Sequence, residues 1–360
     1  MAEFLRNCWY VACAGIEIDK RPLARTILDT PVVLYRLADG SPAALQDRCP
    51  HRFVPLSMGR VVGNNLQCIY HGLQFDQRGN CVLNPHAGSA SAPFRVGSYP
   101  VVERYGYVWI WPGEAKRAHP DLLPDLPFLQ DETRFRTVRG YLVVAAHHEL
   151  ISDNLLDLSH VEFLHPLLSR EEGVAAHRIE FYQEGNAVFA NRWKPNSKPN
   201  GFLRMFSFGP DERSDARANM KWLPPGILRF DLGACSVGGE PEEGLCTPAA
   251  HLLTPETAHR THYFWAQSRN QRLDDPQLDQ KLWAETSRIF DTEDRPVIEA
   301  QQRAMGQEVD LMKLKPLLFK PDTPTVMARR TLARLIKEEN AARERDGVGQ
   351  AGSSSVSGYS

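Results

Sequence analysis

The amino-acid sequence predicts an α+β protein in which an all-β domain precedes a second domain with an antiparallel sheet flanked by helices. Three observations indicate this class. The chain has 360 residues, which is more than one compact domain usually needs. Residues 1–115 contain short runs rich in Val, Tyr, Trp and Phe, divided by Gly, Asn, Asp and Pro. Beyond residue 130, stretches with the apolar spacing of a helix alternate with further strand-like runs.

The strand-like runs of the first part include TPVVLYRL, AALQDRCP, GNNLQCIYHGLQFD and YGYVWIWPG, and they predict a small barrel or sandwich. Residues 112–130 are proline-rich and irregular, as expected of a linker. Residues 147–165 then predict a helix that Pro166 closes, residues 178–270 predict a set of strands, and residues 275–305 predict a second long helix.

A last helix is expected over residues 324–343. The tail over 345–360 is rich in Gly and Ser and is expected to be disordered. The predicted domains are therefore 1–120 for the β domain and 121–344 for the α+β domain.

The composition excludes several classes of protein. The formal net charge is −2 and no basic stripe stands out, so nucleic acid is not an expected partner. No apolar run approaches the roughly 18–20 residues of a membrane span. The N-terminus MAEFLRNCWYVACAGIEID lacks the basic segment, apolar core and cleavage site of a secretion signal. We therefore expect a cytoplasmic protein.

The seven cysteines, an odd number scattered along the chain, argue against a disulfide framework. Two of them have histidines nearby, as Cys49-Pro-His51 and, after sixteen residues, Cys68-Ile-Tyr-His71. Zinc accepts two thiolates and two imidazoles, but a zinc finger usually presents its cysteines together and then its histidines on a helix. One cysteine and one histidine per loop suits a [2Fe–2S] cluster, in which the cysteines hold one iron and the histidines the other.

The runs CPHRFVPLSMG and CIYHGLQFDQRG resemble the two cluster loops of Rieske-type non-haem iron oxygenases. Further segments are similar to the vanillate O-demethylase and dicamba monooxygenase group of that family, namely NCWYVA, ERYGYVWIWPG, DNLLDLSHVEFLHP and THYFWAQSRN. The resemblance covers almost the whole chain. It implies a Rieske domain over 1–120 and a helix-grip catalytic domain over 121–344 that holds a mononuclear Fe(II).

In that family, a D-x2-H-x4-H element supplies two histidine ligands to the iron and a distant Asp supplies the third. The matching residues here are His160, His165 and Asp294. Two imidazoles and one carboxylate on one face of an octahedral ion leave positions open for O₂ or water. Asp291 and Glu293 compete with Asp294 for the carboxylate role. The alternative for the two histidines is an ordinary place on a helix surface or in a core.

A regular helix does not bring both histidines to one ion, because five residues at about 100° each leave them roughly 140° apart. Pro166 disfavours α geometry at His165, and a π-type bulge is another way to change the spacing. We therefore expect a distorted helix end between residues 160 and 165.

The resemblance also implies roles for two residues that precede His160 on the same helix. Asp157 would accept hydrogen bonds from His160 and from His71 of a neighbouring subunit, which would give electrons a route from the cluster to the iron. Asn154 would lie near the iron. A bridge between subunits implies a head-to-tail ring, and the family implies a trimer.

Substrate-binding residues are harder to assign. His251 falls where a relative places a substrate-contacting histidine, and core packing is the alternative. Arg204 and Arg229 lie in strand-like runs and are candidates to pair with a substrate carboxylate. Where dicamba monooxygenase has a pocket tryptophan, this chain has Glu285, which argues against dicamba as its substrate.

The expected function is that of a terminal oxygenase component. A reductase with flavin and iron–sulfur groups, with or without a ferredoxin, would take electrons from NAD(P)H and deliver them to the cluster. The expected reaction is O-demethylation of a methoxylated aromatic acid with O₂, releasing formaldehyde. The alternatives are hydroxylation or dihydroxylation of another aromatic substrate and, remotely, an electron carrier with an inert second domain.

Overall fold

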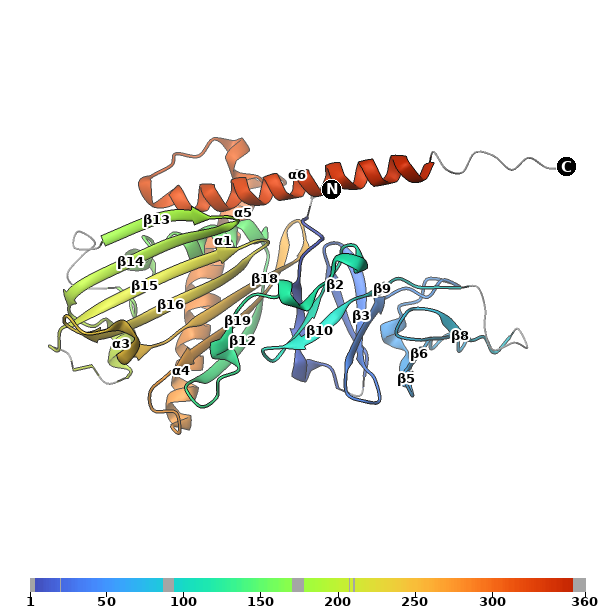
Figure 1. The fold of residues 1–360 in the computed structure, drawn as a ribbon, viewed down its shortest axis with the longest axis horizontal. Coiled ribbons are helices and arrows are strands. Elements are labelled where there is room, and N and C mark those ends of the chain that lie inside the picture. The colour runs from blue at the N-terminus through green and yellow to red at the C-terminus, as the bar shows by residue number, and fades with distance from the viewer. Residues whose placement is uncertain are drawn as a thin grey trace.

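The structure, a computed structural model, describes residues 4–19, 21–86, 94–169, 178–206, 208–209 and 211–351, with side chains as far as residue 345. It confirms the predicted α+β class. Small antiparallel sheets occupy the first third of the chain, and a large antiparallel sheet with helices packed on it follows (Figure 1).

The N-terminal part of the described chain is built from three small sheets. The first has the order β1 (Tyr10–Ala14), β11 (Tyr107–Ile110), β10 (Val101–Arg104). The second has the order β2 (Leu23–Ile27), β3 (Thr30–Arg36), β4 (Pro42–Gln46), β9 (Ser98–Tyr99). The third has the order β5 (Arg60–Val62), β6 (Asn65–Gln67), β7 (Gln74–Phe75), β8 (Cys81–Leu83).

Strand β3 explains how these sheets hold together. Successive side chains of a strand point to opposite faces. Val32 and Leu34 therefore enter one apolar core, and Val33 and Tyr35 enter a second core that also contains Cys49 and Cys68. The two loops that carry Cys49 and Cys68 thus pack on this second core.

The large sheet has the order β12, β19, β18, β16, β15, β14, β13, with β17 paired to β16, and all of these described strands pair antiparallel. The strands are β12 (Arg136–Val144), β13 (Arg178–Glu184), β14 (Ala187–Ser197), β15 (Ser214–Leu223), β16 (Ile227–Ser236), β17 (Leu245–Cys246), β18 (Ala249–Thr257) and β19 (Arg260–Arg269).

Most of the helical residues lie in two regions of the chain, 148–164 and 276–351. The helices are α1 (His148–Leu156), α2 (Val161–Leu164), α3 (Gly201–Arg204), α4 (Pro276–Arg288), the π-helical segment η7 (Ile289–Asp294), α5 (Arg295–Met305) and α6 (Thr323–Ala351). The short 3₁₀ helices are η1 (Gly15–Glu17), η2 (Leu56–Met58), η3 (Ala115–Arg117), η4 (Pro120–Leu122), η5 (Pro127–Leu129), η6 (Pro241–Glu243), η8 (Leu311–Leu314) and η9 (Lys320–Asp322).

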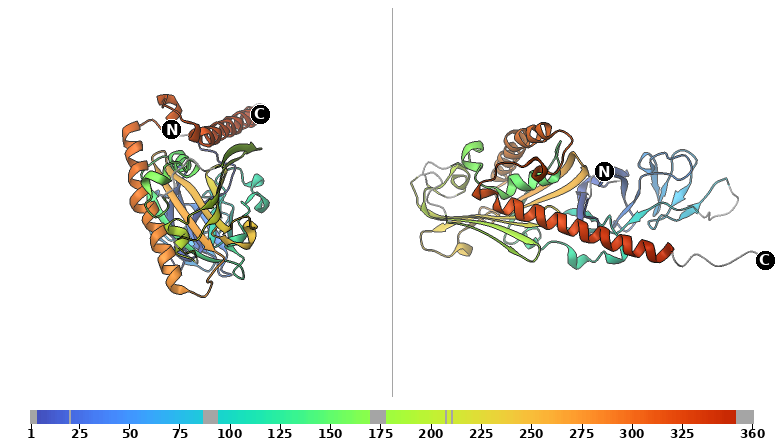
Figure 2. Two further views of the ribbon diagram at one scale, coloured as in Figure 1. Left: turned by 90° about the vertical axis from the view of Figure 1, so that its left-hand side faces the viewer. Right: turned by 90° about the horizontal axis from the view of Figure 1, so that it is seen from above.

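The two faces of the large sheet pack against different partners. On one face, residues such as Trp222 and Trp265 share a core with Leu150 of α1, Ile298 of α5 and Leu332 of α6. The other face packs against the N-terminal sheets in a separate apolar core, whose members include Trp9, Trp109, Leu252 and Phe264. Figure 2 shows the long helix formed by α4, η7 and α5 along one side of the sheet.

The predicted linker, residues 112–130, is folded and packs against the rest of the protein. It contains the 3₁₀ helices η3, η4 and η5, and Leu126 and Phe128 within it are buried in the core between the two parts. The last helix extends beyond its predicted end: α6 reaches Ala351 and includes the first residues of the expected disordered tail. The rest of that tail, residues 352–360, lies outside the described residues.

Helix α6 also fastens the start of the chain. The carboxylate of Glu339 accepts hydrogen bonds from the backbone N–H groups of Arg6 (3.0 Å) and Asn7 (2.7 Å), and Figure 1 shows α6 running from the large sheet toward the N-terminal part. Among the described residues, every helix is too short or too polar to cross a lipid bilayer.

Candidate metal centres and substrate cavity

The loops after Cys49 and Cys68 fold in the same way. The N–H of Phe53 donates to the carbonyl of Cys49 (2.9 Å), and the N–H of Gly72 donates to that of Cys68 (3.1 Å). Phe53 and Gly72 both have the left-handed backbone that such tight turns need, with φ of 61° and 74°. Each loop therefore presents its cysteine and its histidine from an equivalent turn.

Of the four predicted cluster residues, the two cysteines are buried and the two histidines are more exposed. Cys49 and Cys68 are each 2% exposed, His51 is exposed and His71 is half-buried. The two imidazole rings lie 4.4 Å apart, centroid to centroid. Burial, above all, raises the pKa of Cys49 to about 11, and the neighbouring Cys68 adds to this rise. A metal must therefore displace the thiol protons when it binds.

The spacing of these side chains also bears on the zinc alternative. A single tetrahedral ion with bonds of about 2.0–2.3 Å holds its ligand atoms roughly 3.3–3.8 Å apart. Among the described residues, the one group of three or more such ligands within 4.8 Å of one another is His160, His165 and Asp294. Within the described part of the chain, no three of the four predicted cluster residues therefore have the spacing that a single tetrahedral ion needs.

The predicted distortion between residues 160 and 165 is present. Helix α1 ends at Leu156, His160 stands just before the single turn of α2, and His165 follows it with an extended backbone (φ −116°, ψ 92°). His160 keeps helical backbone angles and His165 does not, so the chain departs at His165 from the regular helix on which the two imidazoles would lie about 140° apart.

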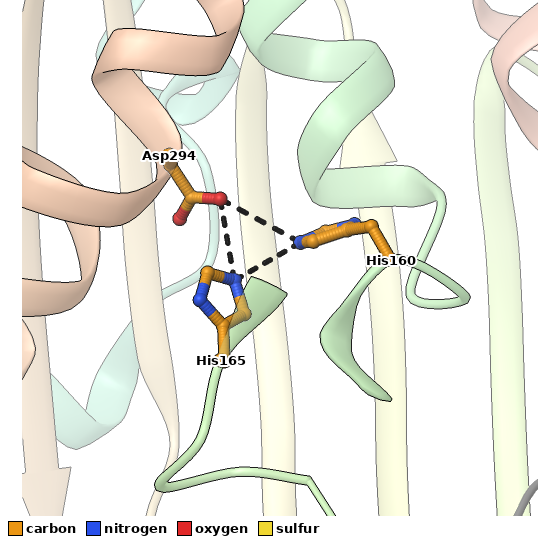
Figure 3. Close-up of side chains that lie close together, drawn as sticks. All are labelled: His160, His165 and Asp294. Carbon is orange, nitrogen blue, oxygen red and sulfur yellow. Dashed lines mark hydrogen bonds and ion pairs between the residues drawn. The ribbon is translucent and has the colours of Figure 1, made fainter. Parts of the chain in front are cut away.

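The third predicted ligand lies on a second distortion. Asp294 is the last residue of the π-helical segment η7, and it is 4% exposed. Its Oδ1 atom lies 3.2 Å from His165 Nε2 and 3.6 Å from His160 Nε2, and the two Nε2 atoms lie 3.1 Å apart (Figure 3). The rival carboxylates have other partners, since Asp291 pairs with Arg295 and Glu293 contacts His165 Nδ1.

These three groups fit a divalent ion. With bonds of about 2.1 Å, an octahedral ion holds adjacent ligands about 3.0 Å apart. His160 Nδ1–H donates to the backbone carbonyl of Asp157, and His165 Nδ1–H donates to Glu293 Oε2 at 2.7 Å. Each Nε2 therefore carries a lone pair, and two lone pairs and a carboxylate oxygen converge on one point.

The surroundings affect the two histidines differently. Burial is the largest influence on His160 and lowers its pKa, which favours the neutral imidazole that a metal needs. Burial acts in the same direction on His165, but Asp294 and Glu293 outweigh it and raise its pKa.

Asn154 lies beside this group, as predicted from the resemblance, and its amide donates to Asp294 Oδ1 at 3.0 Å. The predicted hydrogen bond between His160 and the Asp157 carboxylate is wrong, because His160 bonds to a different atom of Asp157. His160 bonds to the backbone carbonyl of Asp157, while a carboxylate oxygen of Asp157 accepts from the N–H of Ser159 at 2.8 Å. The reason is local: the chain leaves α1 at Asp157, so its own carbonyl is free for the imidazole.

A cavity of about 130 Å³ opens beside the three groups, between the large sheet and the helices. It is comparable to a 150 Å³ protein cavity that binds benzene. Apolar walls dominate it, for example Leu158, Phe202, Met220, Phe230 and Phe290, and the polar members include Arg192, Lys194, Arg217, His251 and Gln267.

His251 lies in this cavity and is 3% exposed. Its Nδ1 contacts the hydroxyl of Tyr263 at 2.8 Å, and its Nε2 has no hydrogen-bond partner among the described residues. Burial lowers its pKa to about 4, so the ring is neutral at pH 7. When the Tyr263 hydroxyl donates to Nδ1, Nε2 carries the hydrogen and is free to donate to a ligand.

The predictions for two arginines were wrong. Arg204 is exposed on α3, and Arg229 lies over the ring of Phe128, so neither lines the cavity. The sequence reasoning missed Arg192 and Lys194 instead. They continue the buried alternation of Val188 and Ala190 along β14, which is the signal that could have found them.

Comparison with known proteins defines the class. Residues 8–100 match the Rieske [2Fe-2S] domain family, and residues 144–338 match the vanillate O-demethylase oxygenase C-terminal domain family. The chain therefore belongs to the Rieske-type non-haem iron oxygenases, as an oxygenase component that carries a [2Fe–2S] cluster and a mononuclear iron. The predicted family and enzyme class are confirmed.

Individual relatives narrow the group. The oxygenase component of dicamba O-demethylase from Stenotrophomonas maltophilia is 37% identical, over 94% of this chain and 99% of its own. A vanillate O-demethylase oxygenase subunit from Pseudomonas sp. strain HR199 is 31% identical, over 94% and 97%. A crystal structure of dicamba monooxygenase bound to dicamba has a TM-score of 0.88 at 36% identity, over 94% of this chain and 100% of the other.

Proposed function

We propose that this oxygenase removes the methyl group from a methoxylated aromatic acid, as the terminal component of a multicomponent system. The cluster is held by Cys49, His51, Cys68 and His71, and the Fe(II) by His160, His165 and Asp294. The observation that carries the proposal is a cavity of the size of one aromatic ring, lined by all three proposed iron ligands. The domains that hold the two centres divide between residues 120 and 121.

The reaction balances as follows. ArOCH₃, O₂, two electrons and two protons give ArOCH₂OH and water, and the hemiacetal then breaks its C–O bond to give a phenol and formaldehyde. Bound Fe(II) supplies the activation of O₂, for which a facial triad leaves open positions. The apolar walls exclude water, Asn154 orients Asp294, and His251 Nε2–H donates to the acid group. The basic side chains of Arg192 and Lys194 line the cavity and favour an anionic substrate.

Electrons come from NAD(P)H through a separate reductase, with or without a ferredoxin, in the cytoplasm, where the free cysteines stay reduced. We also propose the head-to-tail trimer. Exposed apolar residues stand beside both centres, namely Phe53 (60%), Ile69 (64%) and Tyr70 (54%) at the cluster loops and Phe163 (88%) on α2. Asp157 is half-buried beside α2, where it can meet His71 of a neighbouring subunit.

The test is a panel of methoxylated aromatic acids with a surrogate reductase, in which NADH loss, O₂ uptake and formaldehyde are followed together. We expect one formaldehyde per phenol formed. Hydroxylated or dihydroxylated product without formaldehyde would favour the alternative reactions. Cluster reduction without any substrate-dependent O₂ uptake would favour the electron carrier.

Removing a proposed ligand tests the iron site separately. His160→Ala and Asp294→Asn should abolish turnover and lower bound iron by about one atom per chain, while the cluster spectrum remains. Cys68→Ser should abolish that spectrum. If His160→Ala kept full turnover, the assignment of the iron ligands would be wrong.

A further inference from the structure

Glu293 lies between a proposed iron ligand and an arginine. Its Oε2 accepts the Nδ1–H of His165 at 2.7 Å, and its Oε1 contacts an NH group of Arg288. Arg288 in turn donates from Nε to Glu285 at 3.0 Å. The Glu293 side chain is 12% exposed, whereas those of Arg288 and Glu285 are 40% and 31% exposed. The three residues therefore form a chain that begins at the surface and ends at His165.

We propose that Glu293 is a positioning residue for the iron site, held in place by Arg288 and Glu285. This inference rests on the proposed iron ligands and deepens that assignment. Glu293 fixes the tautomer of His165, sets the plane of its ring and makes its Nε2 a stronger donor, because a carboxylate partner raises the basicity of a ligating imidazole. Arg288 supplies the opposite charge that keeps this carboxylate in one orientation.

The contrast with His160 supports a special role for Glu293. His160 Nδ1 donates to a neutral carbonyl, that of Asp157, so only His165 has a carboxylate behind it. The π-helical segment makes this arrangement: Glu293 and Asp294 are adjacent in η7, yet Glu293 contacts Nδ1 of His165 while Asp294 lies against its Nε2. Two adjacent residues of one segment thus contact the two ring nitrogens of His165.

The experiment measures Fe(II) affinity, not activity alone. Apo-protein that retains its cluster but lacks mononuclear iron is titrated anaerobically with Fe(II) against a competing chelator, and with Co(II) as a spectroscopic probe of the ligand set. The variants are Glu293→Gln, Glu293→Ala and Glu285→Gln. Asp291→Asn is the matched control, because Asp291 is on the same segment, is 48% exposed and pairs with Arg295.

We expect Glu293→Ala to weaken Fe(II) binding by about 10- to 100-fold. Glu293→Gln should weaken it less, because the amide still accepts a hydrogen bond, and Glu285→Gln least. Asp291→Asn should leave the affinity unchanged. Both Glu293 variants should also alter the Co(II) absorption spectrum, which a role in folding alone would not do.

Unchanged Fe(II) affinity and Co(II) spectra in folded Glu293→Ala and Glu293→Gln would overturn this inference, and so would a lower melting temperature as their sole effect. His165→Ala separates the inference from the proposed function. If the parent protein bound no Fe(II) at this site, or if His165→Ala bound it equally well, the ligand assignment itself would fail, whatever the Glu293 variants did.

Discussion

The side-chain amide of Asn154 donates a hydrogen bond to Oδ1 of Asp294, with Nδ2 and Oδ1 3.0 Å apart. This is the same oxygen that faces the Nε2 atoms of both His160 and His165. Asn154 therefore competes for one lone pair of the proposed ligand atom and limits how that carboxylate can rotate. A residue of α1 thus acts on a residue of η7 across the cavity wall.

Asn154→Ala should release this carboxylate. We expect turnover to fall by about tenfold, in the range found for partners of metal ligands, with the cluster spectrum and the thermal stability nearly unchanged. Asn154→Asp should cost more, because it sets a second carboxylate beside Asp294. Steady-state kinetics with the iron content of each preparation checks this. Parental turnover in Asn154→Ala would mean that Asp294 needs no such support.

His251→Phe should affect substrate binding more than chemistry. The ring is kept, but the Nε2–H that we assign to the acid group of the substrate is lost. For a methoxylated aromatic acid, KM should rise about tenfold or more, the cost of losing a hydrogen bond to a charged group, while kcat changes less. A neutral methoxy analogue is the control, since its KM should stay within about twofold. Equal effects on both substrates would show that His251 only packs the cavity.

Arg329 ties α6 to α1. Its guanidinium donates to both carboxylate oxygens of Asp153 and to Glu149 at 2.9 Å, and its side chain is 6% exposed. Arg329→Met should destabilise the protein by about 3–5 kcal/mol, because two mostly buried carboxylates lose their partner. Urea unfolding measures this. Arg334→Met on the same helix is the control: its side chain is 48% exposed, and we expect less than about 1 kcal/mol. Similar losses in the two variants would contradict the prediction.

His147 gives the stability a defined pH dependence. Burial, followed by the charge of Arg329, lowers its pKa to about 3, while an unfolded histidine titrates near 6.5. Between these values the unfolded chain binds a proton that the native state does not. Stability is therefore retained above about pH 6.5 and lost as pH falls toward 3, at up to about 1.4 kcal/mol per pH unit for this group.

His147→Asn should reduce that slope, because it removes the titrating group and keeps a good N-cap for α1. Urea midpoints between about pH 7 and pH 4.5 would measure the difference. His119→Asn, at an exposed position, should leave the slope as it is in the parent. Parallel pH profiles for the parent and His147→Asn would exclude His147 as the source.

Local patterns, together with the family resemblance, indicated the proposed ligands from the sequence alone. The two Cys–His loops, His160, His165 and Asp294 each lie in a short segment with its own spacing, and Pro166 disfavours helical geometry at His165. The roles of Glu293 and of Lys194 could not be predicted in this way. The first depends on a π-helical segment that turns Glu293 toward His165, and the second depends on which face of β14 meets the helices. Both are properties of tertiary packing, which a one-dimensional pattern does not contain.

The π-helical segment η7 makes the oxygenase sensitive to chain length at one point. A π turn contains one residue more than an α turn, so deleting a single codon between Ile289 and Thr292 would let α4 and α5 join as an ordinary helix. Asp294 would then turn about 100° around the helix axis. A neighbouring residue would face His160 and His165 in its place. The insertion or loss of one residue in this segment would therefore be enough to distinguish a descendant protein that activates oxygen from one that does not. This would hold even if the gene still encoded every ligand side chain.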